Sequence, residues 1–358
     1  MIHVLADENI AGLNAYLSRH DNIKLTTAHG RTLLAHADMP ADALFIRSVT
    51  RINENSLAAL PNLPRFVGAA TLGIDHVDTA YLKKMGVDFA SAAGSSKHSV
   101  AQYVITAILN ARPESLTTPI RLGIVGLGHI GGTLARYAKK LGWQVVGYDP
   151  FLPASDLNQS KTALYACDVI SLHTPLTKTG DFPTWQMIDR AFLDALPPDT
   201  LLINAARGSI IDETALLADI KKTGRQAVLD VFAKEPTPSR TLIGAVTFAT
   251  PHIAGYTLDA KLRGTDMIYQ AFCRAFDLPI LSTLTDHLPE SPYHFSALKT
   301  RLHQGDRFAL QEFYDLKKDA AALNSAIDGE CVPAAAFDSL RKNYPLKREW
   351  LFDDIDRP

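Results

Sequence analysis

The chain has 358 residues, 47% of them hydrophobic, which is more than one hydrophobic core usually serves, so we expect at least two domains. Its formal net charge of −2 and the lack of any long run of Lys or Arg argue against nucleic acid and anionic lipid as partners. Asp7 and Glu8 stand where a signal peptide would be apolar, and no apolar stretch reaches membrane-spanning length, so we expect a cytosolic protein that does not bind membranes.

The first hundred residues alternate short apolar runs with helical patterns. Strands are predicted at residues 2–6, 43–46 and 66–69, because brief apolar runs are typical of strands buried in a parallel sheet. One long helix is predicted from Ser99 to Ala111, where Arg112-Pro113 ends it. This alternation indicates an α/β domain with a doubly wound parallel sheet of the flavodoxin or Rossmann kind.

Residues 121–149 combine a strand, a Gly-x-Gly-x-x-Gly turn, a helix and a second strand that ends in an acid. Gly126 permits the tight turn, Gly128 lets the backbone approach a pyrophosphate, and Gly131 lets the helix pack close to the sheet. The N-terminus of the helix then faces the anion. Asp149 is expected to accept the ribose hydroxyls, and its charge disfavours the 2′-phosphate of NADP. The motif residues predicted to bind NAD are Gly126, Gly128, His129, Ile130, Gly131 and Asp149.

A glycine triplet by itself is weak evidence, because many glycine-rich turns bind nothing. The flanking strand, helix and acid supply the context that a dinucleotide motif requires, and they favour it over a bare structural turn.

Four more apolar runs, separated by helical patterns, follow Asp149 and would complete a second, six-stranded parallel sheet. They lie at residues 169–173, 201–205, 227–231 and 246–249. The helical pattern from Ile253 to Phe276 is assigned to the first domain, since the six strands are complete before it. Thr285 to Pro292 carries two prolines and is predicted to be a linker, and a further helix is expected from Gln311 onward. The predicted division is a substrate-binding domain at 1–95 and 254–284, an NAD-binding Rossmann domain at 96–253, and a small α+β C-terminal module at 285–358.

The three cysteines, Cys167, Cys273 and Cys331, are widely spaced and form no Cys-x-x-Cys pattern. They are predicted to be reduced packing residues, and no metal site is expected.

Three polar segments follow predicted strands of the second sheet, at the end where open parallel sheets build their sites. Arg207, in NAARG, is suited to hold a substrate carboxylate through two hydrogen bonds in a geometry that Lys does not reproduce. Glu235 lies in DVFAKEP and His252 in TPHIAGY. Taken singly, Arg207 is more simply explained by pairing with a surface acid, Glu235 by solvation in a loop, and His252 by a structural role.

Considered together, the three residues meet the needs of alcohol oxidation with NAD. A base must take the hydroxyl proton while hydride leaves the carbon, and His252 suits that role. A carboxylate on the far ring nitrogen, such as Glu235, would hold the tautomer. Arg207 would bind the substrate and polarise the forming carbonyl.

The set GLGHIG, Asp149, HTPLT at 173–177, NAARG, DVFAKEP and TPHIAGYT resembles the D-isomer-specific 2-hydroxyacid dehydrogenases over nearly all of the chain up to about residue 280. The resemblance implies NAD-dependent oxidation of a 2-hydroxy acid, with Arg207, Glu235 and His252 as the catalytic trio. The cofactor contacts that it implies beyond the glycine motif are Thr174, Ala205, Ala206, Arg207, Asp230 and Gly255.

Residues 47–50, 68–78 and 337–350 are similar to one branch of this family, which acts on a phosphorylated sugar acid and has an extra C-terminal dimerisation domain. This similarity implies a small phosphorylated 2-hydroxy acid as substrate and a homodimer formed through the C-terminal module. The substrate contacts that it implies are Ser48, Thr71 and Tyr256. From the sequence pattern alone, these three hydroxyl-bearing residues would be interpreted as ordinary turn and cap residues.

Basic residues near these positions are candidates for binding the substrate phosphate. Arg47 adjoins Ser48, and a guanidinium is a suitable partner for a phosphate. Arg341, Lys342 or Arg348 in the C-terminal module would instead approach the active site of a partner subunit.

The chain departs from the family at Gly94-Ser95-Ser96-Lys97, where a Gly-Cys-Asn or Gly-Asn-Asn turn is common, and at Gln102, where a Glu is common. Two alternative functions stay open. One is a dehydrogenase for another D-2-hydroxy acid, such as 3-phosphoglycerate. The other is a corepressor-like protein that senses NAD(H) and keeps the trio. Formation of NADH on adding substrate separates an enzyme from a sensor.

Overall fold

The computed structural model describes residues 1–36, 40–291, 293–312 and 314–350. It divides into two compact units, each of which is made of two stretches of chain. Unit 1 comprises Met1–Ser96 and Thr257–Glu290, and unit 2 comprises Lys97–Tyr256 and Ser291–Pro358. The first two predicted domains correspond closely to these units, but residues from 291 onward group with unit 2 instead of standing apart.

Unit 1 is built on a five-stranded parallel sheet with the order β2-β1-β3-β4-β5, which is the flavodoxin-like order. Its strands are β1 (Ile2–Asp7), β2 (Ile23–Ala28), β3 (Ala43–Ile46), β4 (Phe66–Ala69) and β5 (Asp88–Ser91). The apolar runs predicted β1, β3 and β4. The two edge strands, β2 and β5, were missed because they are only partly buried and their sequences, IKLTTA and DFAS, are half polar.

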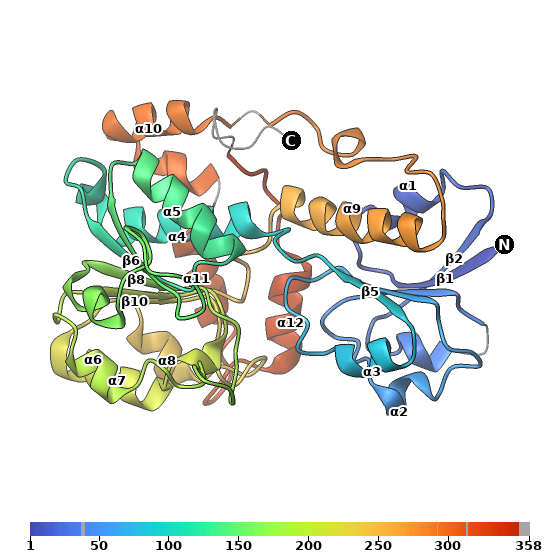
Figure 1. Cartoon of the computed structure of the whole chain (residues 1–358). Helices are drawn as coiled ribbons and strands as arrows, with labels where there is room; N and C mark the ends of the chain where they lie inside the picture. The colour runs from blue at the N-terminus through green and yellow to red at the C-terminus, as the bar shows by residue number, and fades with distance from the viewer. Residues whose placement is uncertain (37–39, 292, 313, 351–358) are drawn as a thin grey trace. The chain divides into compact units, whose positions relative to one another are not determined.

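Helices cover both faces of this sheet (Figure 1). One face packs against α1 (Leu13–Leu17) and α9 (Leu258–Ala275), where Phe45, Phe66 and Phe272 meet in tilted and edge-on contacts. The other face packs against the 3₁₀ turn η1 (Leu33–His36), α2 (Glu54–Leu57) and α3 (Thr79–Lys84). Unit 1 is thus a doubly wound α/β layer structure, as the sequence predicted.

Unit 2 contains a six-stranded parallel sheet with the order β11-β10-β9-β8-β6-β7. Its strands are β6 (Arg121–Val125), β7 (Gln144–Tyr148), β8 (Val169–Leu172), β9 (Leu201–Asn204), β10 (Ala227–Leu229) and β11 (Phe248–Ala249). Four of them, β8 to β11, coincide with the predicted runs to within two residues, and β6 and β7 are the two strands predicted within residues 121–149. The strand order reverses between β6 and β8, and this switch point at the carboxyl ends is where open α/β sheets bind their ligands.

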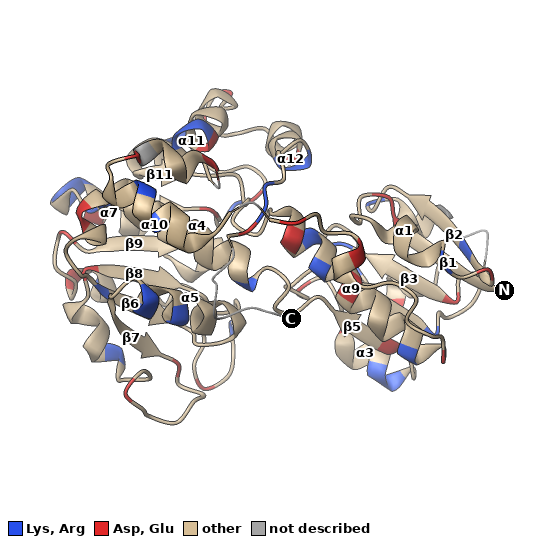
Figure 2. Cartoon of the chain, turned by 90° about the horizontal axis from the view of Figure 1, so that it is seen from above, with Lys and Arg blue, Asp and Glu red and all other residues tan. Residues whose placement is uncertain are grey.

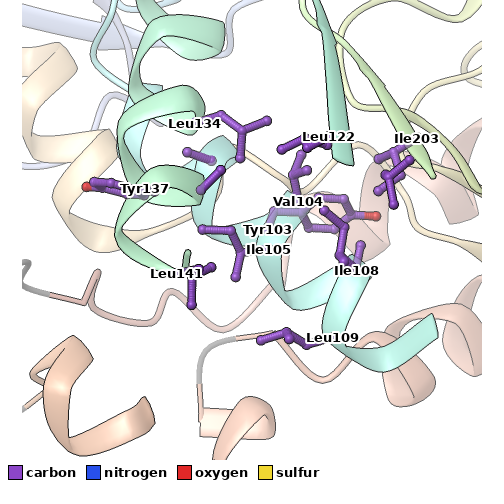
Figure 3. Packing of buried hydrophobic residues seen from close by; sticks show 14 of the residues in the cluster. Tyr103, Val104, Ile105, Ile108, Leu109, Leu122, Leu134, Tyr137, Leu141 and Ile203 are labelled. Carbon is purple, nitrogen blue, oxygen red and sulfur yellow. The ribbon is translucent and has the colours of Figure 1, made fainter. Parts of the chain in front are cut away.

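One face of the second sheet is covered by α4 (Lys97–Ala111) and α5 (His129–Lys140). Figure 3 shows Val104, Ile105 and Ile108 of α4 packed among Leu122 of β6 and Leu134 of α5. Every residue of α4 from His98 to Leu109 is buried, which explains why its sequence lacks a polar face. The opposite face carries α6 (Arg190–Asp194), α7 (Glu213–Thr223) and α8 (Arg240–Ala245) (Figure 1).

The C-terminal segment packs on unit 2 instead of forming its own core. Its helical elements are α10 (Phe295–His303), η6 (Arg307–Glu312), α11 (Leu316–Ser325) and α12 (Ala334–Lys342). Leu298 and Trp350 join the cluster around α4, whereas Leu323 and Phe337 join the cluster on the opposite face of the sheet. A segment of this size buries too little surface to stand alone, so it covers its apolar side chains with the neighbouring unit.

This arrangement corrects the expectation of a separate α+β module. Between residues 285 and 350, the described residues form helices and isolated bridges of Cys331 with Ser239 and Asp328, and no strand. Residues 351–358 lie outside the described part of the chain.

Gln102 accounts for one departure from the family pattern. Its side-chain amide nitrogen donates to the Trp350 carbonyl (3.1 Å), and its amide oxygen accepts from the Trp350 amide (3.0 Å). A carboxylate accepts but does not donate when ionised, so a Glu at this buried position would satisfy only one of the two groups. The Gln therefore ties the C-terminal segment to α4.

Figure 2 shows Lys and Arg mixed with Asp and Glu on the helices of both units. Among the described residues, no helix is long and apolar enough to cross a membrane, and no three His, Cys, Asp or Glu side chains gather as a metal site would need. Cys167 and Cys273 are buried thiols and Cys331 is partly buried. The cytosolic location stays a prediction.

Candidate active site

The three motif glycines between β6 and α5 occupy different environments. Gly126 has φ +90°, a backbone conformation that residues other than glycine rarely adopt. A Cβ at Gly131 would lie 1.9 Å from the Gly126 carbonyl oxygen, so only glycine allows α5 to start this close to the strand. Gly128 caps α5, and a Cβ built there would meet nothing within 4 Å. The turn therefore has open space beside the helix N-terminus, where a pyrophosphate fits.

Asp149 follows β7 and lies beside this turn. Its carboxylate accepts hydrogen bonds from the backbone amides of Leu127 (3.0 Å) and Phe151 (3.1 Å). Its own backbone is bonded in both directions to the side chain of Asn158, which has 6% of its surface exposed. These bonds place a fixed negative charge at the edge of the glycine turn, as a ribose-binding acid requires.

Thr174 completes the switch point from the end of β8. Its methyl group faces Gly126, and its Oγ1 is buried without a hydrogen-bond partner among the described residues. A buried hydroxyl without a partner is costly, and a polar ligand would satisfy it. The open glycine turn, the Asp149 carboxylate and the Thr174 hydroxyl together fit NAD.

We expect Asp149→Ala to weaken NAD binding and to narrow the preference for NAD over NADP by about ten- to a hundredfold, because an ionic hydrogen-bond acceptor is lost and the repulsion of a 2′-phosphate disappears. Titrations of both cofactors measure this change. Asp156→Ala, an exposed acid in the same loop, is the matched control. If Asp149→Ala leaves the cofactor preference unchanged, the ribose site is elsewhere.

The structure brings Glu235 and His252 into direct contact. His252 Nδ1 and Glu235 Oε2 are 2.8 Å apart, and Glu235 Oε1 accepts from the Phe232 amide at 2.8 Å. Burial raises the pKa of Glu235, but attraction to His252, its hydrogen bonds and the positive charge of Arg341 outweigh burial and lower the pKa overall. Glu235 is therefore an ionised carboxylate that fixes one ring nitrogen of His252.

Arg207 lies on a turn that is held against the Glu235 loop. Asn204 pins this turn, because its side chain accepts from the Ala206 amide (3.1 Å) and donates to the Arg207 carbonyl (2.9 Å). A Cβ at Gly208 would lie 1.9 Å from the Phe232 carbonyl carbon. The segment that carries Arg207 thus touches, backbone to backbone, the segment whose Phe232 amide binds Glu235.

The loop that carries His252 is anchored by the buried Asp230, at the end of β10. Asp230 Oδ1 accepts from Thr250 Oγ1 (2.6 Å) and the Ile253 amide (2.8 Å), and Oδ2 accepts from the Ala254 amide (2.8 Å). Burial raises the pKa of Asp230 to about 6, although His252 and these hydrogen bonds act in the opposite direction. His252 itself has φ 57°, a strained conformation that persists only where its surroundings fix it.

Helix α4 and the C-terminal segment support the same loop from behind. Tyr103 Oη lies 2.6 Å from Thr250 Oγ1, and the Ala254 carbonyl accepts from Ser99 Oγ (2.8 Å) and Tyr314 Oη (2.7 Å). The sequence did not single out Tyr103 or Tyr314, because a buried tyrosine in an apolar stretch looks like any core aromatic residue.

The remaining predicted site residues are found in both units. Ser48 and Thr71 follow β3 and β4 of unit 1, at the carboxyl ends of adjacent strands, and Thr71 Oγ1 donates to the Gly73 carbonyl (2.9 Å). Tyr256 belongs to unit 2, where the ring of Tyr344 meets it edge-on and Arg341 lies over it. His129 and Ile130 begin α5, Ala205 and Ala206 follow β9, and Gly255 lies in the His252 loop.

A sequence model described as the NAD binding domain of the D-isomer specific 2-hydroxyacid dehydrogenases matches residues 109–254. The chain is also 46% identical, over 99% of its length and 100% of the relative's, to a protein of Psychrobacter sp. (strain PRwf-1) named erythronate-4-phosphate dehydrogenase. The chain belongs to the D-isomer-specific 2-hydroxyacid dehydrogenase family. A second relative of the same name, from Acinetobacter baumannii (strain ACICU), is 42% identical to this dehydrogenase over 97% of both chains.

Solved structures have the same fold as this dehydrogenase at lower identity. An NAD⁺-bound 3-phosphoglycerate dehydrogenase of Entamoeba histolytica is 21% identical, with a TM-score of 0.64, and covers 77% of this chain and 95% of its own. A D-lactate dehydrogenase of Aquifex aeolicus, in complex with NAD and lactic acid, is 23% identical, with a TM-score of 0.61 and the same coverage. This chain is an NAD-dependent oxidoreductase.

Proposed function

We propose that this dehydrogenase oxidises 4-phospho-D-erythronate at C2 to (R)-3-hydroxy-2-oxo-4-phosphooxybutanoate with NAD, a step of pyridoxal 5′-phosphate (vitamin B6) biosynthesis. The observation that carries the proposal is the 42–46% identity to relatives named for this activity over almost the whole of both chains. The Glu235–His252 pair supports the reaction type.

His252 is the general base of the proposed reaction. With Nδ1 bound to Glu235, the opposite ring nitrogen, Nε2, is left to take the proton of the C2 hydroxyl. Glu235 stabilises the imidazolium that forms, because it is an ionised carboxylate 2.8 Å from the ring. Arg207 binds the substrate carboxylate with its planar guanidinium and polarises the forming carbonyl. NAD, held by the glycine turn, Asp149 and Thr174, would supply the acceptor for the hydride from C2.

The proposed contacts to cofactor and substrate are those that the sequence indicated. Asp230 acts mainly by holding the His252 loop, since both its oxygens are engaged there. The proposed cofactor contacts are Gly126, Gly128, His129, Ile130, Gly131, Asp149, Thr174, Ala205, Ala206, Arg207, Asp230 and Gly255, and the proposed substrate contacts are Ser48, Thr71 and Tyr256.

A panel of acids tests the proposed substrate. NADH formation is followed with 4-phospho-D-erythronate, D-erythronate and 3-phosphoglycerate, with and without an added 2-oxo acid that reoxidises NADH in place. We expect the highest kcat/KM for 4-phospho-D-erythronate. A higher value for 3-phosphoglycerate would assign the site to another substrate, and no NADH with any of the acids would favour a sensor of NAD(H).

We also propose that the protein is a homodimer through residues from about 285 onward. Phe308 is 74% exposed and Leu346 is 41% exposed, whereas the other large apolar side chains of this segment are mostly buried. Residues of a dimer interface are exposed in this way when one subunit is considered alone. Because this segment also covers the core of unit 2, its removal would unfold the chain. A sharper test than truncation is to measure the molar mass of the full chain and of its Phe308→Ser variant by light scattering. A wild-type monomer at micromolar concentration, or an unaltered dimer in Phe308→Ser, would contradict an interface at Phe308.

A further inference from the structure

Helix α12 of the C-terminal segment lies directly on the candidate active site. Phe337 is fully buried, and its ring meets that of Phe232 edge-on, with 6.5 Å between the ring centroids. Phe232 is the residue whose amide binds Glu235. The C-terminal segment therefore contacts the catalytic loop of its own chain.

Arg341 follows Phe337 by one helical turn and points to the same region. Its guanidinium carbon lies 5.6 Å from the ring centroid of Tyr256 and 6.0 Å from that of Phe337. Tyr256 is a proposed substrate contact in the loop that carries His252. The charge of Arg341 also reaches Glu235, whose pKa it helps to lower. The guanidinium is thus close to Tyr256, and its charge acts on Glu235.

Arg341 forms no ion pair with an acid among the described residues, although its charge acts on Glu235, and its Nε is buried without a hydrogen bond. Two other arginines of unit 2, Arg225 and Arg301, differ in this respect. Arg225 binds Asp219 at 2.5 Å, and Arg301 binds Asp306 and Glu312 at 2.8 Å each. A partly buried cation without an anion is costly, so a site that keeps one is suited to an anionic ligand.

We propose that Arg341 binds the phosphate of the substrate and so determines the preference for a phosphorylated 2-hydroxy acid. This inference rests on the proposed function. The substrate carries an anionic group at each end, and Arg207 is assigned to the carboxylate, so a second cation is required for the phosphate. The ring of Tyr256 makes a cation–π contact with Arg341. The same side chain carries the hydroxyl group that is the proposed substrate contact.

Arg47 of unit 1 is the competing candidate for the phosphate. Its Nη1 lies 3.9 Å from Oδ1 of Asp7, a buried acid, so part of its charge is already compensated. Although the charge of Arg341 acts on Glu235, Arg341 forms no ion pair among the described residues, which is why we assign the phosphate to it.

The test compares Arg341→Met with Lys317→Met, which removes an exposed charge from helix α11 of the same segment. For each variant, kcat/KM is measured with 4-phospho-D-erythronate and with D-erythronate. We expect the ratio of the two values to fall about ten- to a hundredfold in Arg341→Met, as for the loss of an ionic hydrogen bond. We expect Arg341→Lys to fall between wild type and Arg341→Met, and Lys317→Met to keep the wild-type ratio.

A purely structural role of Arg341 would lower kcat/KM for both acids by the same factor, and this outcome would overturn the proposal. The proposal would also be overturned if Arg341→Met kept the wild-type ratio of the two kcat/KM values while Arg47→Met lost the preference for the phosphorylated acid. If the wild-type protein oxidises neither acid, the proposed function fails, but the phosphate site is still tested by heating the protein with inorganic phosphate. We expect phosphate to raise the Tm of the wild type and of Lys317→Met more than that of Arg341→Met, and equal shifts would refute the site.

Discussion

Replacing His252 by Gln is expected to lower kcat by about a hundred- to ten-thousandfold, the usual contribution of a positioned general base. The amide keeps a polar group near Glu235 but takes no proton at pH 7. NAD binding should change little, because the substitution leaves the proposed cofactor contacts at the glycine turn, Asp149 and Thr174 intact. Single-turnover formation of NADH and a cofactor titration measure the two effects separately.

Glu235→Gln should lower kcat in the same direction, since it removes the charge that stabilises the His252 imidazolium. His303→Gln, on the exposed end of α10, is the matched control for a His-to-Gln change and should behave as wild type. Turnover close to wild type in His252→Gln would show that another group takes the proton.

Gly208→Ala should disrupt both stability and turnover. The added methyl group would lie 1.9 Å from the Phe232 carbonyl carbon and 2.3 Å from the Ala233 amide, and backbone atoms do not yield as a flexible side chain does. Overpacking of this kind costs about 1–3 kcal/mol. The Arg207 turn and the Glu235 loop must separate to relieve it, so we expect a lower Tm and a kcat/KM reduced at least tenfold.

Gly244→Ala is a matched control for this substitution. Gly244 lies in the exposed part of α8, and a Cβ there meets nothing within 4 Å, so the change should raise stability slightly through helix propensity. A Gly208→Ala variant with the same Tm and turnover as Gly244→Ala would contradict the close approach of the Gly208 and Phe232 backbones.

The sequence by itself determined the features that depend on short-range constraints. Buried strands of a parallel sheet must be short and apolar, so β1, β3, β4 and the six strands of unit 2 could be located by pattern alone. The glycine turn and Asp149 are spaced along one βαβ unit, and that spacing predicted their arrangement. Arg207, Glu235 and His252 could be singled out because each follows a strand of the same sheet.

Only the tertiary structure decided which of these residues meet and what supports them. The contact of Gly208 with Phe232 joins two segments that follow different strands, and no local pattern reports such an approach. The C-terminal segment was expected to stand apart, because its sequence shows apolar side chains but not what covers them, and the structure buries them on both faces of unit 2. The same docking brings Arg341 beside Tyr256 of its own chain, where the sequence had suggested a partner's active site. Side-chain contacts between distant segments are set by packing of the whole unit, so they are absent from any local stretch of sequence.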